Sequence, residues 1–316
     1  MQKKLLIIPF LLISFWAGAQ KKMYLFSTFR EPATEGLYLA SSADGYHWDD
    51  LGGPYLKPEV GQQKVMRDPS VVQGPDGTFH LVWTSSWKGD LGFGYASTKD
   101  FIHWSSEKFI PVMTHDTSTV NVWAPELFYD DQEKEFMIVW ASTIPFKFEK
   151  GQEEERNNHR LYYTTTRDFE TFSETKLYFD PKFSVIDAMI VKRGKKDYVL
   201  VHKDNTRPMR NIKVSFGQSP LGPWSRSSEP FTPFKSEGPT VAKVGKDYLI
   251  YYDAYGDFKY GASRTRDFKK FEDVSSQVSL PKGHKHGTIF MVDKKVIEKL
   301  NRLKISYYRL RNVDQI

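Results

Sequence analysis

The chain has 316 residues, 40% of them hydrophobic and 15% aromatic, which is enough to bury a large core in one or two domains. Lys and Arg are interleaved with Asp and Glu, so the net charge of +6 forms no basic stripe, and we expect no nucleic-acid partner. Cysteine is absent, which excludes disulfides, thiol catalysis and thiolate metal sites.

The first residues have the pattern of a secretory signal. Lys3 and Lys4 precede an apolar run over residues 5–16, and Ala-Gly-Ala follows at 17–19. This run is shorter than the roughly 20 apolar residues of a transmembrane helix, so it predicts a signal peptide over residues 1–19 and no membrane span. We therefore expect an exported protein, periplasmic or secreted, whose residues 20–316 form a single domain.

Innermost strands of a repeated unit are predicted at five places along the chain. Three of them begin with a carboxylate that precedes a short apolar run, at Asp68, Asp187 and Glu237. The segments 125–129 and 286–290 share the same shape. If these segments surround one axis, their equivalent positions meet, and the three carboxylates share a pocket.

A second recurring feature is an Asp followed four positions later by an aromatic residue. The pairs are Asp44 and Trp48, Asp100 and Trp104, Asp168 and Phe172, and Asp267 and Phe271, with a degenerate copy that ends at Trp224. The aromatic positions lie 47 to 68 residues apart, and each interval holds several strand-like runs with turns such as Gly-Pro-Asp-Gly at 74–77. Repeats of this length predict the blades of a β-propeller, and five copies predict five blades.

The two ends of the chain complete the count. Residues 286–292 look like an innermost strand with no hairpin after it, whereas 23–29 and 37–40 look like later strands with no innermost strand before them. We expect the N- and C-terminal segments to form one blade together and close the ring. Apart from a candidate short helix at 294–300, the prediction is therefore an all-β, five-bladed β-propeller.

Three acids in one pocket have three chemical uses: binding a hard cation, forming an ion-pair network, or acid–base catalysis. Calcium takes six or more oxygen ligands, commonly from one loop, whereas these acids head separate strands. An inverting glycosidase needs one carboxylate to activate water and one carboxylic acid to protonate the leaving oxygen. A third carboxylate nearby would keep the pKa of the acid raised. The arrangement favours acid–base catalysis.

Motifs at these positions resemble glycoside hydrolase family 43, whose members are inverting enzymes on a five-bladed propeller. The matching motifs, in the order of the family and over nearly all of the mature chain, are Arg67-Asp68-Pro69-Ser70, Trp123-Ala124-Pro125-Glu126-Leu127, Ile186-Asp187, Glu237-Gly238-Pro239 and His286-Gly287-Thr288. The resemblance implies Asp68 as general base, Asp187 as the residue that modulates the pKa of the acid and orients the substrate, and Glu237 as general acid. Ala188 departs from the proline that often follows the modulating Asp in the family.

Some further positions are candidates for contact with the substrate. The resemblance implies that Trp123 lies near the pocket, with Glu126 in a supporting role, and that His286 points into the channel. A His there orders water or, in some members, a cation, so His286 is either a buried hydrogen-bonded residue or a ligand. We assign no metal site and expect no required cofactor; a structural cation in the channel has no other support in the sequence.

The remaining candidates lie in loops. Trp87 either stacks on a sugar face or packs at an edge. Arg207 and Arg210 either clamp sugar hydroxyls or are ordinary surface residues, and Arg210 is included among the substrate-binding candidates.

The predicted function is that of an inverting, exo-acting α-L-arabinofuranosidase that acts as a monomer on arabinose- or galactofuranose-containing oligo- and polysaccharides, such as plant side chains. A β-galactofuranosidase or β-xylosidase on the same scaffold remains an alternative. The related fructosidases of the invertase type use Asn-Asp-Pro and Glu-Cys motifs, which this chain lacks. A propeller that only binds glycans is a further alternative, and loss of one of the three acids would mark it; here all three are present.

Overall fold

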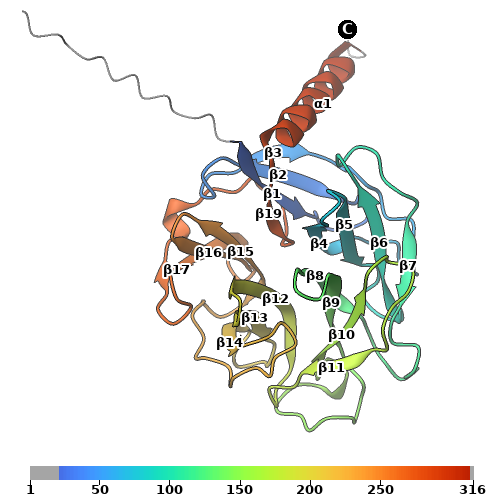
Figure 1. Ribbon diagram of the computed structural model, residues 1–316, viewed down its shortest axis with the longest axis vertical. Helices are drawn as coiled ribbons and strands as arrows, with labels where there is room; N and C mark the ends of the chain where they lie inside the picture. Colours follow the sequence, from blue (N-terminus) through green and yellow to red (C-terminus); the bar gives the residue numbers. More distant parts are fainter. Residues whose placement is uncertain (1–20, 314–316) are drawn as a thin grey trace, which may run out of the picture.

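The computed structural model describes residues 21–313, with side chains as far as residue 304. Its strands form five sheets around a central axis, which confirms the five-bladed β-propeller (Figure 1). Four sheets have four strands and one has three. The signal peptide predicted for residues 1–19 lies outside the described residues.

The blades are numbered here in the order of their innermost strands. Blade I contains β4 (Arg67–Gln73), β5 (Phe79–Thr84), β6 (Gly92–Thr98) and β7 (Lys108–Pro111). Blade II contains β8 (Trp123–Asp130), β9 (Glu135–Ser142), β10 (Arg160–Thr166) and β11 (Lys176–Phe179). Blade III contains β12 (Val185–Gly194), β13 (Asp197–Asp204) and β14 (Asn211–Gly217). Blade IV contains β15 (Ser236–Val244), β16 (Asp247–Ala254), β17 (Lys259–Thr265) and β18 (Glu272–Asp273). Blade V contains β19 (Ile289–Asp293), β1 (Lys22–Thr28), β2 (Tyr38–Ser42) and β3 (Asp49–Gly52).

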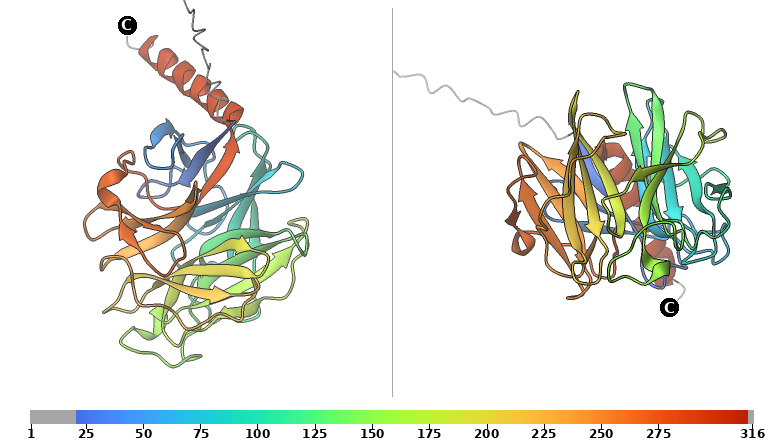
Figure 2. Two further views of the ribbon diagram at one scale, coloured as in Figure 1. Left: turned by 60° about the vertical axis from the view of Figure 1, so that its left-hand side comes forward. Right: turned by 90° about the horizontal axis from the view of Figure 1, so that it is seen from below.

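Blade V is built from both ends of the chain. β19 pairs antiparallel with β1, with Phe290 opposite Leu25, and β1 in turn pairs with β2. The helix α1 (Lys294–Val313) follows β19 directly and extends away from the ring (Figures 1 and 2). It is longer than the helix predicted at 294–300. None of the described helices is long and apolar enough to cross a membrane.

Blade III lacks a regular outer strand because its edge segment is rich in proline. Prolines occupy positions 220, 223, 230 and 233, and each removes a backbone donor from the edge of the sheet. The segment still follows β14: the N–H groups of Ser225, Ser228 and Phe231 donate to carbonyl oxygens of β14. The degenerate repeat that ends at Trp224 therefore marks a blade with an irregular edge.

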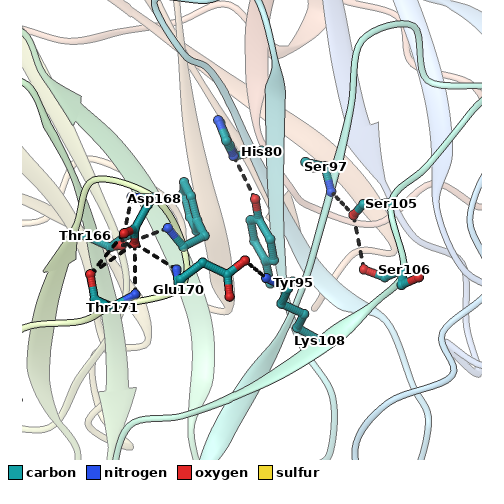
Figure 3. A network of polar contacts seen from close by, with 11 residues as sticks. His80, Tyr95, Ser97, Ser105, Ser106, Lys108, Thr166, Asp168, Glu170 and Thr171 are labelled. Carbon is teal, nitrogen blue, oxygen red and sulfur yellow. Dashed lines mark hydrogen bonds and ion pairs between the residues drawn. The ribbon is translucent and has the colours of Figure 1, made fainter.

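The repeated Asp turns are structural. The carboxylate of Asp168 accepts the N–H groups of Glu170 and Thr171 at 2.8 Å each, and the Thr166 hydroxyl accepts that of Phe169 at 2.9 Å (Figure 3). Phe169 has a left-handed φ of 57° and a buried ring. Lys108 on blade I pairs with Glu170 in this turn and so links two blades (Figure 3). These aspartates shape the outer turns of the blades, away from the axial site.

The four innermost strands that begin at the mouth of the channel share a β-bulge. In each strand one extra residue separates two pairs of the ladder, between Arg67 and Ser70, Trp123 and Glu126, Ile186 and Met189, and Glu237 and Thr240. Within each bulge one residue has a left-handed φ of 47° to 55°, and these residues are Asp68, Ala124, Asp187 and Gly238. Bulges of this kind bend a strand and re-aim its side chains.

The sequence predicts that the three carboxylates occupy equivalent positions in their strands, and the strand pairing shows that only two of them do. Asp68 and Asp187 occupy the same bulge position in their blades, whereas Glu237 precedes that position by one residue. Glu126 follows it by two residues, which places Glu126 deeper in the channel than the other acids. The three carboxylates therefore converge from two different strand positions.

Candidate active site

One cavity of about 340 Å³ opens where the innermost strands begin. It brings together all the residues that the sequence selected for catalysis or substrate contact, namely Asp68, Asp187, Glu237, Trp87, Trp123, Arg210 and His286. Its wall also contains Arg67, Thr84, Glu153, Lys203 and Tyr255, which sequence reasoning did not select. The side chains come from four blades and from the segment that precedes β19.

Asp68 is held as an anion at the floor of the cavity. Its Oδ1 lies 2.8 Å from Nε2 of His286, and the Thr84 hydroxyl donates to its Oδ2 at 2.7 Å. Thr84 in turn accepts the N–H of Ala124 at 2.8 Å, which fixes the hydroxyl. Burial raises the pKa of Asp68, but the hydrogen bonds from His286 and Thr84 and the charge of Arg67 outweigh burial and bring the pKa to about 2. An ionised carboxylate is the state that a general base requires.

His286 is a buried cation between two aspartates. Its Nδ1 lies 3.6 Å from Asp253 Oδ2, on the side opposite Asp68. Burial lowers the pKa of His286, but Asp253 and Asp68 raise it to about 10. Gly238 lies against this ring: a Cβ at Gly238 would come within 2.1 Å of His286 Cγ. The glycine is therefore needed for both its left-handed φ and the close approach of the imidazole.

Asp187 lies close to the backbone of blade IV. Its Oδ2 accepts the N–H of Gly238 at 3.0 Å, so it contacts the residue next to Glu237. Burial raises the pKa of Asp187, and the charges of Glu237 and Asp68 add to this effect against the opposing charges of Lys203 and His286. The pKa of Asp187 thus lies above its usual range.

Glu237 is paired with a buried lysine. Lys203 Nζ donates to Glu237 Oε2 at 2.9 Å, and the lysine side chain is 4% exposed. Burial raises the pKa of Glu237, but Lys203 and His286 outweigh it, so the pKa lies below its usual range. The pKa values of the two carboxyls are therefore shifted in opposite directions, upward for Asp187 and downward for Glu237.

This finding differs from the expectation that a third carboxylate keeps Glu237 protonated. The difference arises from Lys203, which β13 places opposite Ile186 in the hairpin with β12. A lysine at the end of the apolar run 198–202 was the signal in the sequence, because a buried lysine needs an acidic partner.

Two tryptophans form one wall of the cavity. Trp123 Nε1 donates to the carbonyl of Trp87 at 2.9 Å, and the two rings meet edge to face with centroids 5.9 Å apart. Arg67 stacks over Trp87 with its Cζ 3.9 Å from the ring centroid. Trp87 remains 45% exposed although it lines the cavity, so part of its surface is free to contact a ligand.

The loop 143–159 and the loop 205–210 form the opposite wall. Arg207 pairs with Glu154 across the mouth of the cavity. Arg210 forms no ion pair with any described residue and lines the cavity. Glu153 is 3% exposed, and among the described residues neither of its carboxylate oxygens has a hydrogen-bond partner.

Glu126 lies behind Asp68 and Asp187 in the channel. It lines a smaller cavity of about 30 Å³ in the channel, together with Asp68, Asp187 and His286. The Thr288 hydroxyl donates to Glu126 Oε2 at 3.1 Å. Burial raises the pKa of Glu126 to about 7, against hydrogen bonds from Ser70 and Thr288. Glu126 is thus separated from the mouth of the main cavity, in keeping with a supporting role.

One cluster of the described residues has the spacing of a metal site. Glu237, Asp253 and His286 offer ligand atoms that lie within 4.8 Å of one another. Cationic groups already occupy these ligands, because Lys203 contacts Glu237, Lys285 contacts Asp253 at 2.9 Å, and His286 carries its own proton at neutral pH. The cluster fits an ion-pair network better than a cation site.

The fold and the cavity define a propeller protein with an acid–base site at its axis. The sequence matches, over residues 20–298, a family related to glycosyl hydrolase family 43 and described as "Probable glycosyl hydrolase domain". The chain therefore belongs to this family, which confirms the resemblance seen in its motifs.

Similar proteins share parts of the chain or its fold. An α-L-arabinofuranosidase of Bifidobacterium longum subsp. longum is 26% identical over 153 residues, which cover 40% of this chain and only 14% of that protein. A thermostable family-43 glycoside hydrolase superposes with a TM-score of 0.53 at 16% identity, over 70% of this chain and 78% of the other. A Hadza microbial sialidase superposes with a TM-score of 0.54 at 16% identity, over 78% and 56% of the two chains. Because these two structures are named for different activities, the shared fold does not select the substrate.

Proposed function

We propose that this protein is an inverting, exo-acting glycoside hydrolase that releases terminal α-L-arabinofuranose from polysaccharide side chains. The single observation that carries the proposal is the state of the three carboxylates in one cavity. His286 and Thr84 hold Asp68 ionised, and beside it the pKa of Asp187 is raised while that of Glu237 is lowered. Arabinofuranose is chosen because the sequence relative from Bifidobacterium longum is an α-L-arabinofuranosidase.

In this proposal Asp68 is the general base. It removes a proton from a water molecule, which attacks the anomeric carbon on the face opposite the leaving group. The contacts of Asp68 with His286 and Thr84 hold the carboxylate oriented and ionised. Proton transfer of this kind contributes about 10²–10⁴-fold in rate.

Glu237 is the general acid and protonates the leaving oxygen. In the ligand-free protein Lys203 stabilises the ionised form of Glu237. When the substrate enters and weakens the contact with Lys203, the pKa of Glu237 rises, and its carboxyl takes up the proton that it donates to the leaving oxygen. Asp187 accepts the N–H of Gly238 and so keeps the backbone beside Glu237 in place.

The substrate contacts follow from the walls of the cavity. Trp87 and Trp123 present an apolar face to the sugar, and Arg210 and Glu153 offer a donor and an acceptor for its hydroxyls. The protein acts as an exported monomer and needs no cofactor in this proposal. Export is supported by the charged, apolar and small-residue pattern of residues 1–19.

Turnover of p-nitrophenyl α-L-arabinofuranoside tests the proposal. The wild type should release nitrophenol, and Asp68→Asn and Glu237→Gln should each lose most of that activity while keeping the native circular-dichroism spectrum. Equal activity in all three proteins would remove the catalytic roles of these carboxylates. A panel with p-nitrophenyl β-D-galactofuranoside and β-D-xylopyranoside decides between the arabinofuranosidase and the alternatives on the same scaffold.

A further inference from the structure

The aromatic side chains most exposed to solvent gather on the face of the propeller that carries the cavity. Among the described residues, the exposed large aromatic side chains are Trp87, Phe109, Phe146, Phe234 and Phe258. Trp87 lies in the loop between β5 and β6, Phe146 in the loop between β9 and β10, and Phe258 in the loop between β16 and β17. Phe234 lies in the loop that precedes β15. All four loops are at the end of the ring where the cavity opens, whereas Phe109 is not. Single exposed apolar residues are common, but their concentration on one face marks an interaction surface.

Phe234 and Phe258 belong to the part of this face that adjoins Glu237. Phe234 is three residues before Glu237, and Phe258 is three residues after Tyr255, which lines the cavity. Their exposed fractions are 55% and 91%.

The two loops touch each other. A Cβ built on Gly256 would lie 3.0 Å from the side chain of Lys235, so the residue after Phe234 packs against the turn that carries Phe258. Beneath them, Lys203 Nζ lies 5.2 Å from the centroid of the Tyr255 ring, next to its contact with Glu237. The two phenylalanines therefore stand on loops that touch each other, and these loops lead into Glu237 and Tyr255 of the cavity wall.

The chemistry of the reaction assigns a ligand to this surface. A general acid donates its proton to the oxygen that joins the released sugar to the rest of the glycan, so the leaving saccharide must emerge on the Glu237 side of the cavity. Aromatic rings stack on the apolar faces of sugar rings and bury large area at small cost in conformational entropy. Lys259 is paired with Asp257 at 3.2 Å, and Lys235 Nζ lies over the Phe234 ring, 5.7 Å from its centroid. Each flanking cation therefore already has a partner in the protein, which suits a neutral ligand.

We propose that Phe234 and Phe258 form a binding surface for the leaving saccharide, a neutral polysaccharide backbone, at the end of the cavity where Glu237 lies. This surface makes the protein select a sugar attached to a polymer over the same sugar on a small leaving group. The inference rests on the proposed function, because it takes Glu237 as the acid. It adds the class of the leaving group, which the cavity itself does not specify.

The test compares a polymer with an aryl glycoside. The Phe234→Ala/Phe258→Ala variant should keep its kcat/KM on p-nitrophenyl α-L-arabinofuranoside within about twofold, whereas its kcat/KM on arabinoxylan or arabinogalactan should fall roughly tenfold, equivalent to about 1.4 kcal/mol. Phe109→Ala is the matched control, because Phe109 is 36% exposed on the outer strand β7, and it should change neither value. Equal losses on both kinds of substrate, or no loss on either polymer, would overturn the inference.

A binding measurement keeps this inference separate from the proposed function. In affinity gel electrophoresis, soluble arabinoxylan or arabinogalactan in the gel should slow the wild type and Phe109→Ala, and should slow the double variant much less. The protein could be slowed by the polymers through the two phenylalanines and yet hydrolyse no furanoside. That result would contradict the proposed function but would support the glycan-binding surface. A wild type that neither polymer slows would contradict the surface, whatever its activity on aryl glycosides.

Discussion

Lys203 donates a hydrogen bond to Glu237 across 2.9 Å in the centre of the cavity. The contact joins β13 of blade III to β15 of blade IV, and it stabilises the ionised form of the carboxyl that the proposed mechanism uses as an acid. The pKa of Asp187 is shifted in the opposite direction, upward, mainly by burial. This relationship controls the pH range in which the protein should act.

Substitution Lys203→Met should extend activity to higher pH. Removal of the ammonium group takes away the charge that lowers the pKa of Glu237, and a neighbouring opposite charge is worth about 1–3 pKa units to a carboxyl. Because the acid must be protonated, the alkaline limb of kcat/KM should move upward by a similar amount. The pH profile on p-nitrophenyl α-L-arabinofuranoside measures this directly.

Lys213→Met is the control for that experiment. Lys213 pairs with the buried Asp204 at 2.8 Å, and neither residue lines the main cavity, so the variant loses a comparable ion pair away from the site. Its alkaline limb should coincide with that of the wild type. If Lys203→Met also keeps the wild-type limb, the ion pair does not set the protonation of Glu237.

Because of His286, the free energy of unfolding should fall as the pH rises into the alkaline range. Its pKa in the folded protein is about 10, whereas an unfolded histidine has a pKa of about 6.5. A group whose pKa is raised by folding contributes stability that is complete below about pH 6.5 and is lost as the pH rises toward 10. Urea unfolding of the wild type between these pH values should show a falling free energy of unfolding.

His286→Gln should remove that slope. The variant should be less stable by roughly 3–5 kcal/mol at pH 6, because Asp68 and Asp253 lose their shared buried partner, and the difference from the wild type should shrink toward pH 10. His103→Gln is an exposed comparison and should leave the slope unchanged. A constant difference at all pH values would show that His286 is neutral in the folded protein.

Gly238→Ala should disable the site by displacing His286. The new Cβ would collide with the imidazole, and the residue would also carry a left-handed φ of 55°, which costs a non-glycine residue about 1–2 kcal/mol. Gly245→Ala is closely matched: Gly245 has a φ of 60° with no atom within 4 Å of the added Cβ, so it bears only the backbone cost. We expect Gly238→Ala to lose most activity and more stability than Gly245→Ala; similar losses in both would show that the imidazole moves freely.

Glu153→Gln should stabilise the fold and weaken substrate binding. A buried polar group without a hydrogen-bond partner costs about 1–3 kcal/mol, and burial costs more for a group that can carry a charge than for a neutral amide. The KM for the aryl arabinofuranoside should rise if Glu153 accepts hydrogen bonds from sugar hydroxyls. Glu154→Gln, which loses only the exposed pair with Arg207, should change stability by less than about 1 kcal/mol. A lower melting temperature for Glu153→Gln would contradict the unpaired state of this carboxylate.

The repeats made most of the fold predictable from the sequence. Asp turns every 47 to 68 residues and the strand-like runs between them identified five blades, because each turn supports one sheet by local hydrogen bonds. The irregular edge of blade III was visible as a degenerate repeat, but its cause, the four prolines from 220 to 233, became clear only with the pairing of β14. The helix predicted at 294–300 continues to Val313 in α1.

The site was predictable in its acids and not in its cations. Asp68, Asp187 and Glu237 stand at strand starts, where a motif reveals them, whereas Lys203 reaches Glu237 only through the register of a hairpin and the neighbouring blade. Asp68 lies at the left-handed position of its bulge and Glu237 lies one residue before that position, a difference that became clear only from the pairing between strands. The motifs therefore located the carboxylates, and long-range packing determined the directions of their pKa shifts.

The most direct test of the central claim is the anomeric form of the first product. Early proton NMR spectra of p-nitrophenyl α-L-arabinofuranoside with the wild type, recorded before the free sugar mutarotates, should show β-L-arabinofuranose, as expected when Asp68 activates water opposite a leaving group protonated by Glu237. The α-anomer as first product would contradict this account, because it requires a covalent intermediate on a carboxylate.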